Sequence, residues 1–525
     1  MPTPASTDRP LLTRRTLLAA GAAFVLPDLP SFGARHQARR WRPKDFPFAL
    51  GVASGDPDAS SVVLWTRLAP KPLEPDGGMP PEAVDVTWEL AADDGFRNIL
   101  ATGKVRTGPE LGHAVHVEVA NLPADRWFWY RFRSGDVDSP IGRTRTLPAP
   151  DATPPQLRFA FASCQHYETG LYTAYEHMAA QDFDLVVHLG DYIYEGKGRE
   201  GQVRKHQGGK LQTLADYRVR HAQYRSDPLL HGMHARCPWF VTWDDHEVEN
   251  NYADAISQDP KVSPEQFLTQ RAAAYQAYYE AMPLRRTSRP TGSRLQLYRR
   301  ASYGRLAELF VLDTRQYRTD QPNGDGRKAL DAAATATSNT LLGREQRRWL
   351  EAGLVANRAR WHVLAQQVMM GMVGFPTKPD QDLRYSMDQW PGYAHERAEL
   401  LRFLAQKQIA NPIVLTGDIH SHWVNDLRVD DHDAKAPIVA TEFVGTSISS
   451  GGNGAPAEAE LLRLQARNPG LRWLDRRRGY VACTVTPEHW RSDYLVVDQV
   501  TRPGGAVTTA ASFTVDAGRA GAKRA

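Results

Sequence analysis

Apolar and polar residues alternate with a period of two in three segments of the first third of the chain. The segments cover residues 84–90, 115–119 and 128–132. This period places one row of side chains against a core and the other row in solvent, which is typical of β-strands. Turn-forming residues at 54–57 and 76–78 separate such runs. The pattern therefore predicts a small all-β domain, a β-sandwich, over residues 41–147.

A different pattern begins after a Pro-rich joint. Short apolar runs alternate with segments of helical periodicity, which predicts an α/β domain over residues 155–505 with strands buried on both faces. Ser263 can cap one of these helices, with Pro264 in its first turn and Gln266 completing a capping box. Residues 506–525 are rich in Gly, Ala and Thr, so we expect a flexible tail. The apolar runs are 157–162, 183–189, 239–243, 306–312, 361–365 and 412–415, and the helical segments are 171–181, 213–225, 264–281, 343–356 and 394–408.

Composition excludes several classes of protein. Of the 525 residues, 42% are hydrophobic and 24% charged, which is typical of a soluble globular protein and not of a collagen, a disordered chain or a polytopic membrane protein. A net charge of +4 over this length does not predict nucleic-acid binding. Three cysteines are too few for a disulfide scaffold, although Cys237 and Cys483 could form a disulfide in an oxidising compartment.

The N-terminus has the features of an export signal. Arg14 and Arg15 precede an apolar run at 17–26, which is ten residues long, whereas a membrane-spanning helix needs about 20. The run therefore fits the apolar part of a signal sequence. The paired arginines favour a twin-arginine signal over residues 1–34, with an ordinary secretory signal as the alternative. This predicts a periplasmic or secreted protein that the twin-arginine translocation machinery exports.

Polar side chains follow four of the predicted strands at the point where each strand ends. The carboxyl ends of strands in an α/β sheet share one crevice, so we expect these side chains to converge. Phenolate, thiolate, carboxylate and imidazole together suit a Lewis-acidic ion, and tyrosinate best matches ferric iron. The surplus of oxygen donors suits a harder second ion such as calcium, magnesium or manganese. The candidate ligands are Cys164, Asp191, Tyr194, Asp245, Asn250, Asp418 and His420.

Several sequence blocks resemble those of the calcineurin-like metallophosphoesterases, and one has the Asp-x-x-Tyr spacing of the purple acid phosphatases. Together with the signal and the β domain, they make the whole chain similar to the PhoD-like alkaline phosphatase/phosphodiesterase family. The resemblance implies an α/β fold with a metallophosphoesterase-type β-sandwich flanked by helices, preceded by a small all-β domain of fibronectin or immunoglobulin type. The blocks are Ser163-Cys164-Gln165, Gly190-Asp191-x-x-Tyr194, Asp245-His246-Glu247, Asp313-Thr314-Arg315 and Gly417-Asp418-x-His420.

The resemblance also implies roles for these residues. Asp191 would bridge two metals, and Cys164, Tyr194 and His420 would complete a site for Fe³⁺ with it. His246 would lie beside the leaving group as a catalytic residue.

The second metal of the family is described as calcium, and Mg²⁺ or Mn²⁺ could replace it. Asp418 would bind this ion together with Asp245 or Asn250, and the sequence leaves the choice between these two open. Independently of the resemblance, the basic, Gly-rich segment 196–210 follows the Asp191 block, and Arg204 in it could grip a substrate phosphate through two oxygens. A solvated, flexible loop is the alternative for this segment.

These features predict an exported, metal-dependent phosphoesterase that hydrolyses phosphate mono- and/or diesters by in-line attack of a metal-bound hydroxide. Its partners would be small-molecule, lipid or polymer phosphate esters. Three alternatives remain: a phospholipase D-type diesterase on phospholipid or teichoic-acid-like substrates, a redox role for the iron, and a non-catalytic cell-surface binding protein.

Overall fold

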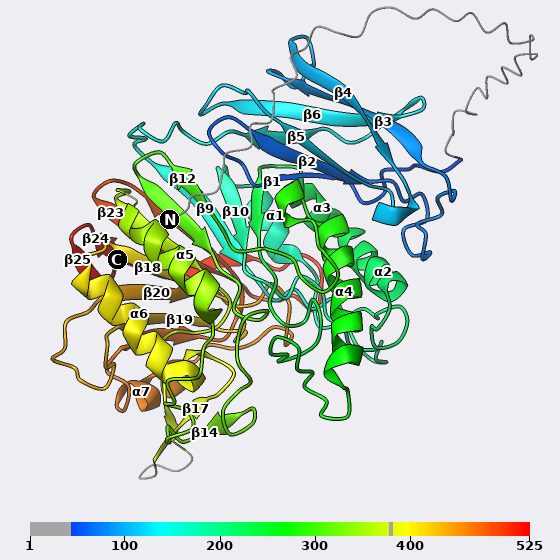
Figure 1. Cartoon of the computed structure of the whole chain (residues 1–525). Coiled ribbons are helices and arrows are strands. Elements are labelled where there is room, and N and C mark those ends of the chain that lie inside the picture. Colours follow the sequence, from blue (N-terminus) through cyan, green and yellow to red (C-terminus); the bar gives the residue numbers. More distant parts are fainter. Residues whose placement is uncertain (1–43, 357, 377–381) are drawn as a thin grey trace, which may run out of the picture. The chain divides into compact units, whose positions relative to one another are not determined.

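The computed structural model describes residues 44–356, 358–376 and 382–525, so the predicted signal segment at 1–34 lies outside the described residues. Its largest sheet has ten strands, among which β9, β10 and β11 are parallel neighbours (Figure 1). Across the sheet the strands are β25 (Arg519–Arg524), β24 (Val507–Asp516), β23 (His489–Val497), β22 (Arg478–Val485), β9 (Leu157–Ala162), β10 (Leu185–His188), β11 (Trp239–Val241), β1 (Val52–Gly55), β2 (Val62–Arg67) and β5 (Ala114–Val119).

A second sheet has seven strands. Four parallel neighbours, β13, β15, β18 and β20, form its centre, and antiparallel strands flank them. In order the strands are β12 (Arg299–Tyr303), β13 (Ala307–Val311), β15 (Trp361–Ala365), β18 (Pro412–Thr416), β20 (Ala440–Val444), β19 (His422–Leu427) and β21 (Leu471–Asp475).

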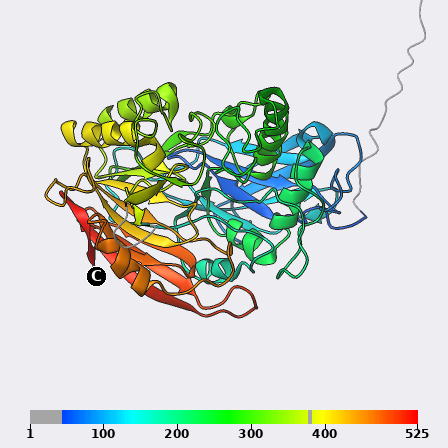
Figure 2. The same cartoon turned by 90° about the horizontal axis from the view of Figure 1, so that it is seen from below.

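The two sheets share an apolar core, and helices cover their other faces. Phe159 and Val187 enter the shared core from the ten-stranded sheet, and Val363 and Leu415 enter it from the seven-stranded sheet. Burial on both faces explains the continuous apolar runs of these strands. In Figure 2 the yellow-green helix α5 (Gly343–Ala356) and the yellow helix α6 (Ala394–Gln406) lie over the yellow and orange strands of the seven-stranded sheet. The helices on the ten-stranded sheet are α1 (Thr173–Ala179), α2 (Leu214–Arg225), α3 (Pro228–His234) and α4 (Pro264–Ala281), and those on the seven-stranded sheet are α5 (Gly343–Ala356) and α6 (Ala394–Gln406).

Helix α4 begins where the sequence predicts. Ser263 accepts a hydrogen bond from the N–H of Gln266, whose side chain accepts one from the N–H of Ser263, and Pro264 occupies the first turn. The predicted capping box is therefore confirmed.

The N-terminal strands form two facing sheets, but one of these sheets is not separate from the rest of the chain. Strands β1, β2 and β5 continue the ten-stranded sheet, because β1 pairs in parallel with β11. Leu64 and Val117 from this side meet Val86 and Phe132 of a five-stranded sheet in one core. The β region at 41–147 is thus hydrogen-bonded to the following domain. The five-stranded sheet contains β4 (Ile99–Thr107), β3 (Val84–Ala91), β6 (Trp127–Ser134), β7 (Val137–Asp138) and β8 (Gly142–Arg145).

The C-terminal segment corrects one prediction. Residues 506–525 are not a flexible tail, because they supply β24 and β25 to the ten-stranded sheet. Phe513 and Val515 enter the core between the two sheets. The Gly, Ala and Thr content concealed a period-two pattern typical of a strand. The backbone of β24 pairs with that of β23. Cys237 and Cys483, which could have formed a disulfide, are both buried free thiols.

The remaining elements are short.

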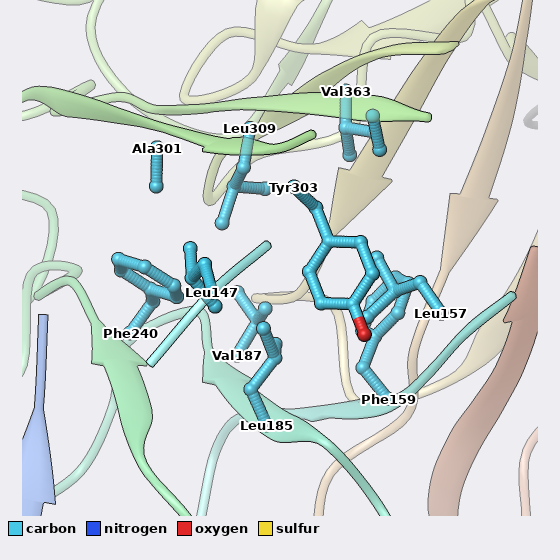
Figure 3. A pocket seen from close by; sticks show the side chains of 11 residues that line it. Leu147, Leu157, Phe159, Leu185, Val187, Phe240, Ala301, Tyr303, Leu309 and Val363 are labelled. Carbon is cyan, nitrogen blue, oxygen red and sulfur yellow. The ribbon is translucent and has the colours of Figure 1, made fainter. Parts of the chain in front are cut away.

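None of the helices that the structure describes combines the length and the apolar character needed to cross a membrane. Between the two large sheets, a cavity of about 30 Å³ is lined only by apolar surface, with Leu309 and Val363 facing Leu185 and Val187 (Figure 3). The short elements are β14 (Arg327–Lys328), β16 (Phe375–Pro376), β17 (Leu383–Ser386), α7 (Glu458–Gln465) and the 3₁₀ turns Pro109–Leu111, Arg286–Ser288 and Trp390–Tyr393.

Candidate metal centre

The polar segments that follow β9, β10, β11 and β18 meet where the two large sheets approach each other. Two glycines allow this approach. A Cβ at Gly417 would lie 2.6 Å from the Ser163 hydroxyl, and a Cβ at Gly190 would lie 2.5 Å from Asp244. The glycine before each aspartate of the two Gly-Asp blocks is therefore required by close packing.

Four residues at these strand ends have left-handed backbone conformations. Their φ angles are 58° at Cys164, 56° at Asp191, 65° at Asp418 and 51° at His420. Non-glycine residues adopt this region at a cost, and such residues concentrate at functional sites. The strain therefore points to the same residues as the sequence pattern.

The first group of candidate ligands contains Cys164, Asp191 and His420, whose ligand atoms all lie within 4.8 Å of one another. Tyr194 reaches the same group: its buried hydroxyl donates to Asp191 Oδ2 at 2.7 Å and lies 3.0 Å from His420 Nε2. The Ser450 hydroxyl is 2.8 Å from it. The structure thus brings together the four residues predicted for the ferric site.

The second group contains Asp191 again, now with Asp245 and His246. Asp191 is almost fully buried, yet its Oδ1 has no hydrogen-bond partner, and the same holds for Oδ2 of Asp244. Burying a carboxylate oxygen without a partner is costly unless it pairs with a cation. A carboxylate shared by two groups, with an unpartnered oxygen, therefore fits a bridging metal ligand.

His246 forms a dyad with a residue that the sequence interpretation missed. Its Nδ1 lies 2.7 Å from Glu195 Oε2, and its ring centroid lies 4.1 Å from that of Tyr194, with the two rings tilted by 31°. Burial opposes protonation of the ring, but Glu195, Asp245 and Asp191 raise the pKa of His246 well above its usual value. Burial alone would raise the pKa of Glu195, but His246 brings it below the usual value. The dyad thus favours an imidazolium–carboxylate pair.

A third group contains Asp244, Asp245 and Asp418, and the buried Arg315 lies against it. Burial raises the pKa of Asp418 to about 7, with Arg315 opposing this shift. The Asp313 carboxylate accepts hydrogen bonds from backbone N–H groups, including that of Arg315, and the Arg315 guanidinium reaches other carboxylates. The sequence block Asp313-Thr314-Arg315 gave no sign of the contact between Arg315 and Asp244.

Glu247 links the loops that follow β10 and β11 through hydrogen bonds. It is buried and accepts hydrogen bonds from the backbone N–H groups of Asp191, Tyr192 and Asp244, at 3.2, 2.5 and 2.8 Å. Burial and the charge of Asp191 raise its pKa to about 8. Its place beside His246 in the sequence block was the only signal for this role.

The two alternatives for the second metal, Asp245 and Asn250, have different surroundings. The Asn250 side-chain amide donates to Gln258, and its backbone N–H donates to Glu195. Asp245 belongs to two of the metal-binding groups, and its Oδ2 accepts from the N–H of Asn251. The Oδ1 of Asn250 is not used in these hydrogen bonds, so the choice between Asp245 and Asn250 stays a prediction.

Arg204 requires a correction. Its guanidinium donates to Asp227 at 2.6 Å and to the carbonyl oxygens of Tyr167 and Gly170, and it stacks on the rings of Tyr167 and Tyr172. The Arg204 side chain is 14% exposed. Arg204 therefore holds the loop in place, and its donors are directed into the protein instead of toward a substrate.

Comparison with known proteins shows which proteins this chain resembles. The PhoD-like phosphatase pattern matches residues 159–494, and the pattern of the N-terminal domain of PhoD-like phosphatases matches residues 34–148. Alkaline phosphatase D of Bacillus subtilis (strain 168) is 50% identical over 514 residues, which cover 97% of this chain and 86% of that protein. A solved structure described as that of PhoD is 50% identical, covers 92% of this chain and 93% of its own, and superimposes with a TM-score of 0.89.

A chain with this fold and these matches is a phosphoric ester hydrolase, which sets aside the alternative of a non-catalytic binding protein. It belongs to the PhoD-like phosphatase family. The resemblance predicted from the sequence blocks is confirmed, and the N-terminal β region has its own counterpart in the family.

Proposed function

We propose that this phosphatase is metal dependent, with two adjoining cation sites that share Asp191. Cys164, Asp191, Tyr194 and His420 would hold Fe³⁺. Asp418, together with Asp245 or Asn250, would hold a harder ion with Asp191, Ca²⁺ in the first place and Mg²⁺ or Mn²⁺ as substitutes. The observation that carries the proposal is the buried Asp191 carboxylate, which belongs to two ligand groups and has an oxygen without a partner. The two facing sheets with outer helices support assignment to the metallophosphoesterase-type sandwich.

Bound cations would lower the pKa of a water molecule and screen the charge of the phosphoryl group. The residues of the chain supply the rest of the reaction. Glu195 accepts a hydrogen bond from Nδ1 of His246, which fixes the ring and leaves Nε2 to deliver a proton to the leaving oxygen. Water attacks phosphorus in line with that oxygen. No covalent nucleophile is needed, in keeping with the lack of a serine nucleophile motif in the sequence.

Substitution of Asp191 tests the proposal. Asp191→Asn keeps the shape of the side chain but removes the charge that two sites would share. We expect iron, the second metal and phosphatase activity to fall together, measured by elemental analysis and by hydrolysis of a nitrophenyl phosphate. Asp151→Asn, the same change at an exposed position, is the control. Full metal content with full activity in Asp191→Asn would refute the bridging role.

The ester preference is part of the proposal. We infer a broad action on mono- and diesters, with a phospholipase D-type action on phospholipid or teichoic-acid-like polymers as the alternative. The ratio of rates on a mono- and a bis-nitrophenyl phosphate decides between a monoesterase and a diesterase. Hydrolysis of phospholipid vesicles then tests the alternative directly.

We also propose export by the twin-arginine route to the periplasm or the medium. The support is the Arg14-Arg15 pair ahead of the apolar run at 17–26. Replacing both arginines by lysine should retain the protein in the cytoplasm, whereas a secretory signal would tolerate the change. Cell fractionation with an activity assay measures the outcome.

A further inference from the structure

Arg478, the first residue of β22, is a buried arginine whose hydrogen bonds all go to uncharged oxygens. It is 4% exposed. Its Nη1 donates to the Ser447 hydroxyl and to the Ser450 carbonyl, its Nη2 donates to the Arg476 carbonyl, and its Nε has no partner. Among the residues that the structure describes, Arg478 makes no ion pair with a carboxylate. A buried guanidinium without a countercharge is costly, so this position calls for an anion that these contacts do not supply.

The acidic side chains that act most strongly on Arg478 belong to the proposed ferric site. Burial lowers the pKa of Arg478 to about 10, and the charges that oppose this shift are those of Cys164 and Tyr194, ahead of that of Asp475. As ligands of Fe³⁺ these two side chains would be anions, a thiolate and a phenolate. The occupied site would therefore supply the countercharge that Arg478 lacks.

Ser450 connects Arg478 to the same two residues. Its hydroxyl lies 2.8 Å from the Tyr194 hydroxyl and donates to the Cys164 carbonyl at 2.7 Å. Arg478 binds the carbonyl oxygen of this serine and thereby fixes where its hydroxyl lies. One arginine thus acts on Tyr194 and Cys164 both through its charge and through Ser450.

We propose that Arg478 is a positioning residue that tunes the ferric site, because it holds Ser450 against Tyr194 and places a positive charge beside Tyr194 and Cys164. A hydrogen bond and a nearby positive charge both lower the energy of the electrons on a phenolate or thiolate, and groups outside the ligand shell tune bound metals in this way. The charge-transfer band of ferric tyrosinate then lies at a shorter wavelength than it would without them. The inference rests on the proposed function, in which these side chains bind Fe³⁺.

The test records the visible absorption band per bound iron, with iron measured by elemental analysis. In Arg478→Gln and Ser450→Ala the band should move to longer wavelength, because the first variant loses the charge and the second loses the hydrogen bond. Arg478→Lys keeps the charge and should move the band less. A merely structural role would lower the iron content and the intensity but leave the wavelength of the maximum unchanged. A maximum at the wild-type wavelength in Arg478→Gln and Ser450→Ala would overturn the inference.

Two neighbouring residues provide matched controls. Arg476→Gln removes a guanidinium that pairs with Glu460, and Ser449→Ala removes a hydroxyl that donates to the His166 carbonyl. Neither change should move the band. A shift in a control as large as that in Arg478→Gln or Ser450→Ala would also overturn the inference.

Ser450→Ala decides the question if Arg478→Gln does not fold. This variant keeps the carbonyl to which Arg478 donates and loses only the hydroxyl beside Tyr194. An unmoved band in Ser450→Ala would then overturn the inference. If wild type binds no iron, the proposed function fails and the inference fails with it, whereas a wild-type band that no variant moves overturns the inference alone.

Discussion

Glu195→Gln isolates the contribution of the Glu195–His246 dyad to catalysis. The wild-type carboxylate lies 2.7 Å from Nδ1 of His246 and stabilises the protonated ring. Glutamine has nearly the same shape but no charge, and its amide favours a neutral imidazole. A hydrogen bond to a charged group contributes about 1.5–3 kcal/mol. At about 1.4 kcal/mol per tenfold change in rate, its loss should lower kcat roughly 10- to 150-fold.

The assay is the pH dependence of kcat and kcat/KM on a nitrophenyl phosphate, together with metal analysis. Because Glu195 belongs to none of the metal-binding groups, metal content should stay at the wild-type level. Loss of the carboxylate lowers the pKa of His246, so the alkaline limb of kcat should move to lower pH. Glu249→Gln is a matched control on the loop that carries His246, because Glu249 pairs with Lys210 and not with His246. A kcat within twofold of wild type, with an unmoved alkaline limb, would refute a proton-delivering dyad.

Three further predictions concern the iron, acid stability and core packing. Tyr194→Phe should bleach the visible absorption expected of tyrosinate on ferric iron, and an unchanged spectrum would remove Tyr194 from the site. Burial lowers the pKa of His116 to about 4 against about 6.5 when unfolded, so its contribution to stability is lost as the pH falls from 6.5 to 4. Between pH 6.5 and 5, the free energy of unfolding of His116→Gln should therefore fall by about 2 kcal/mol less than that of wild type. Chemical denaturation measures both values, and an identical fall would contradict the prediction. Val363→Ile places one methyl group into the cavity of about 30 Å³ and should raise the free energy of unfolding by about 0.7 kcal/mol, whereas a fall would mean that the cavity cannot take a methyl group.

The sequence predicts the α/β core well because both faces of its strands are buried, and continuous apolar runs mark such strands directly. It predicts the C-terminal strands poorly. Ser512 and Thr514 separate Ala511, Phe513 and Val515, and the small and polar residues obscure the alternation. The link between β1 and β11 is also invisible in the sequence, because a single parallel pairing between distant segments leaves no local pattern.

Part of the candidate centre could likewise be predicted from the sequence, and part of it could not. Cys164, Asp191 and His420 could be predicted because each follows an apolar strand, and strand ends converge by topology. Asp388 could not be predicted, because it lies between β17 and a 3₁₀ turn and reaches Arg315 only through the tertiary fold. Arg204 was misassigned because a basic, glycine-rich segment has the same composition whether its arginine faces a substrate or the protein interior.

Charge balance gives a physical reason to expect cations in the proposed centre. Five aspartates and two glutamates gather in it, while Arg315, Arg318 and His246 supply the positive charge of the chain. Buried carboxylates in such excess must be neutralised by protons or by metal ions. Burial is the main cause of the raised pKa of Glu247, about 8, and of Asp418, about 7, and neighbouring carboxylates raise both pKa values further. Metal ions would replace those protons. Because the carboxylates follow strands of both large sheets, the interactions that bind the metals would also join the two sheets. The acidic residues are Asp191, Asp244, Asp245, Asp388, Asp418, Glu195 and Glu247.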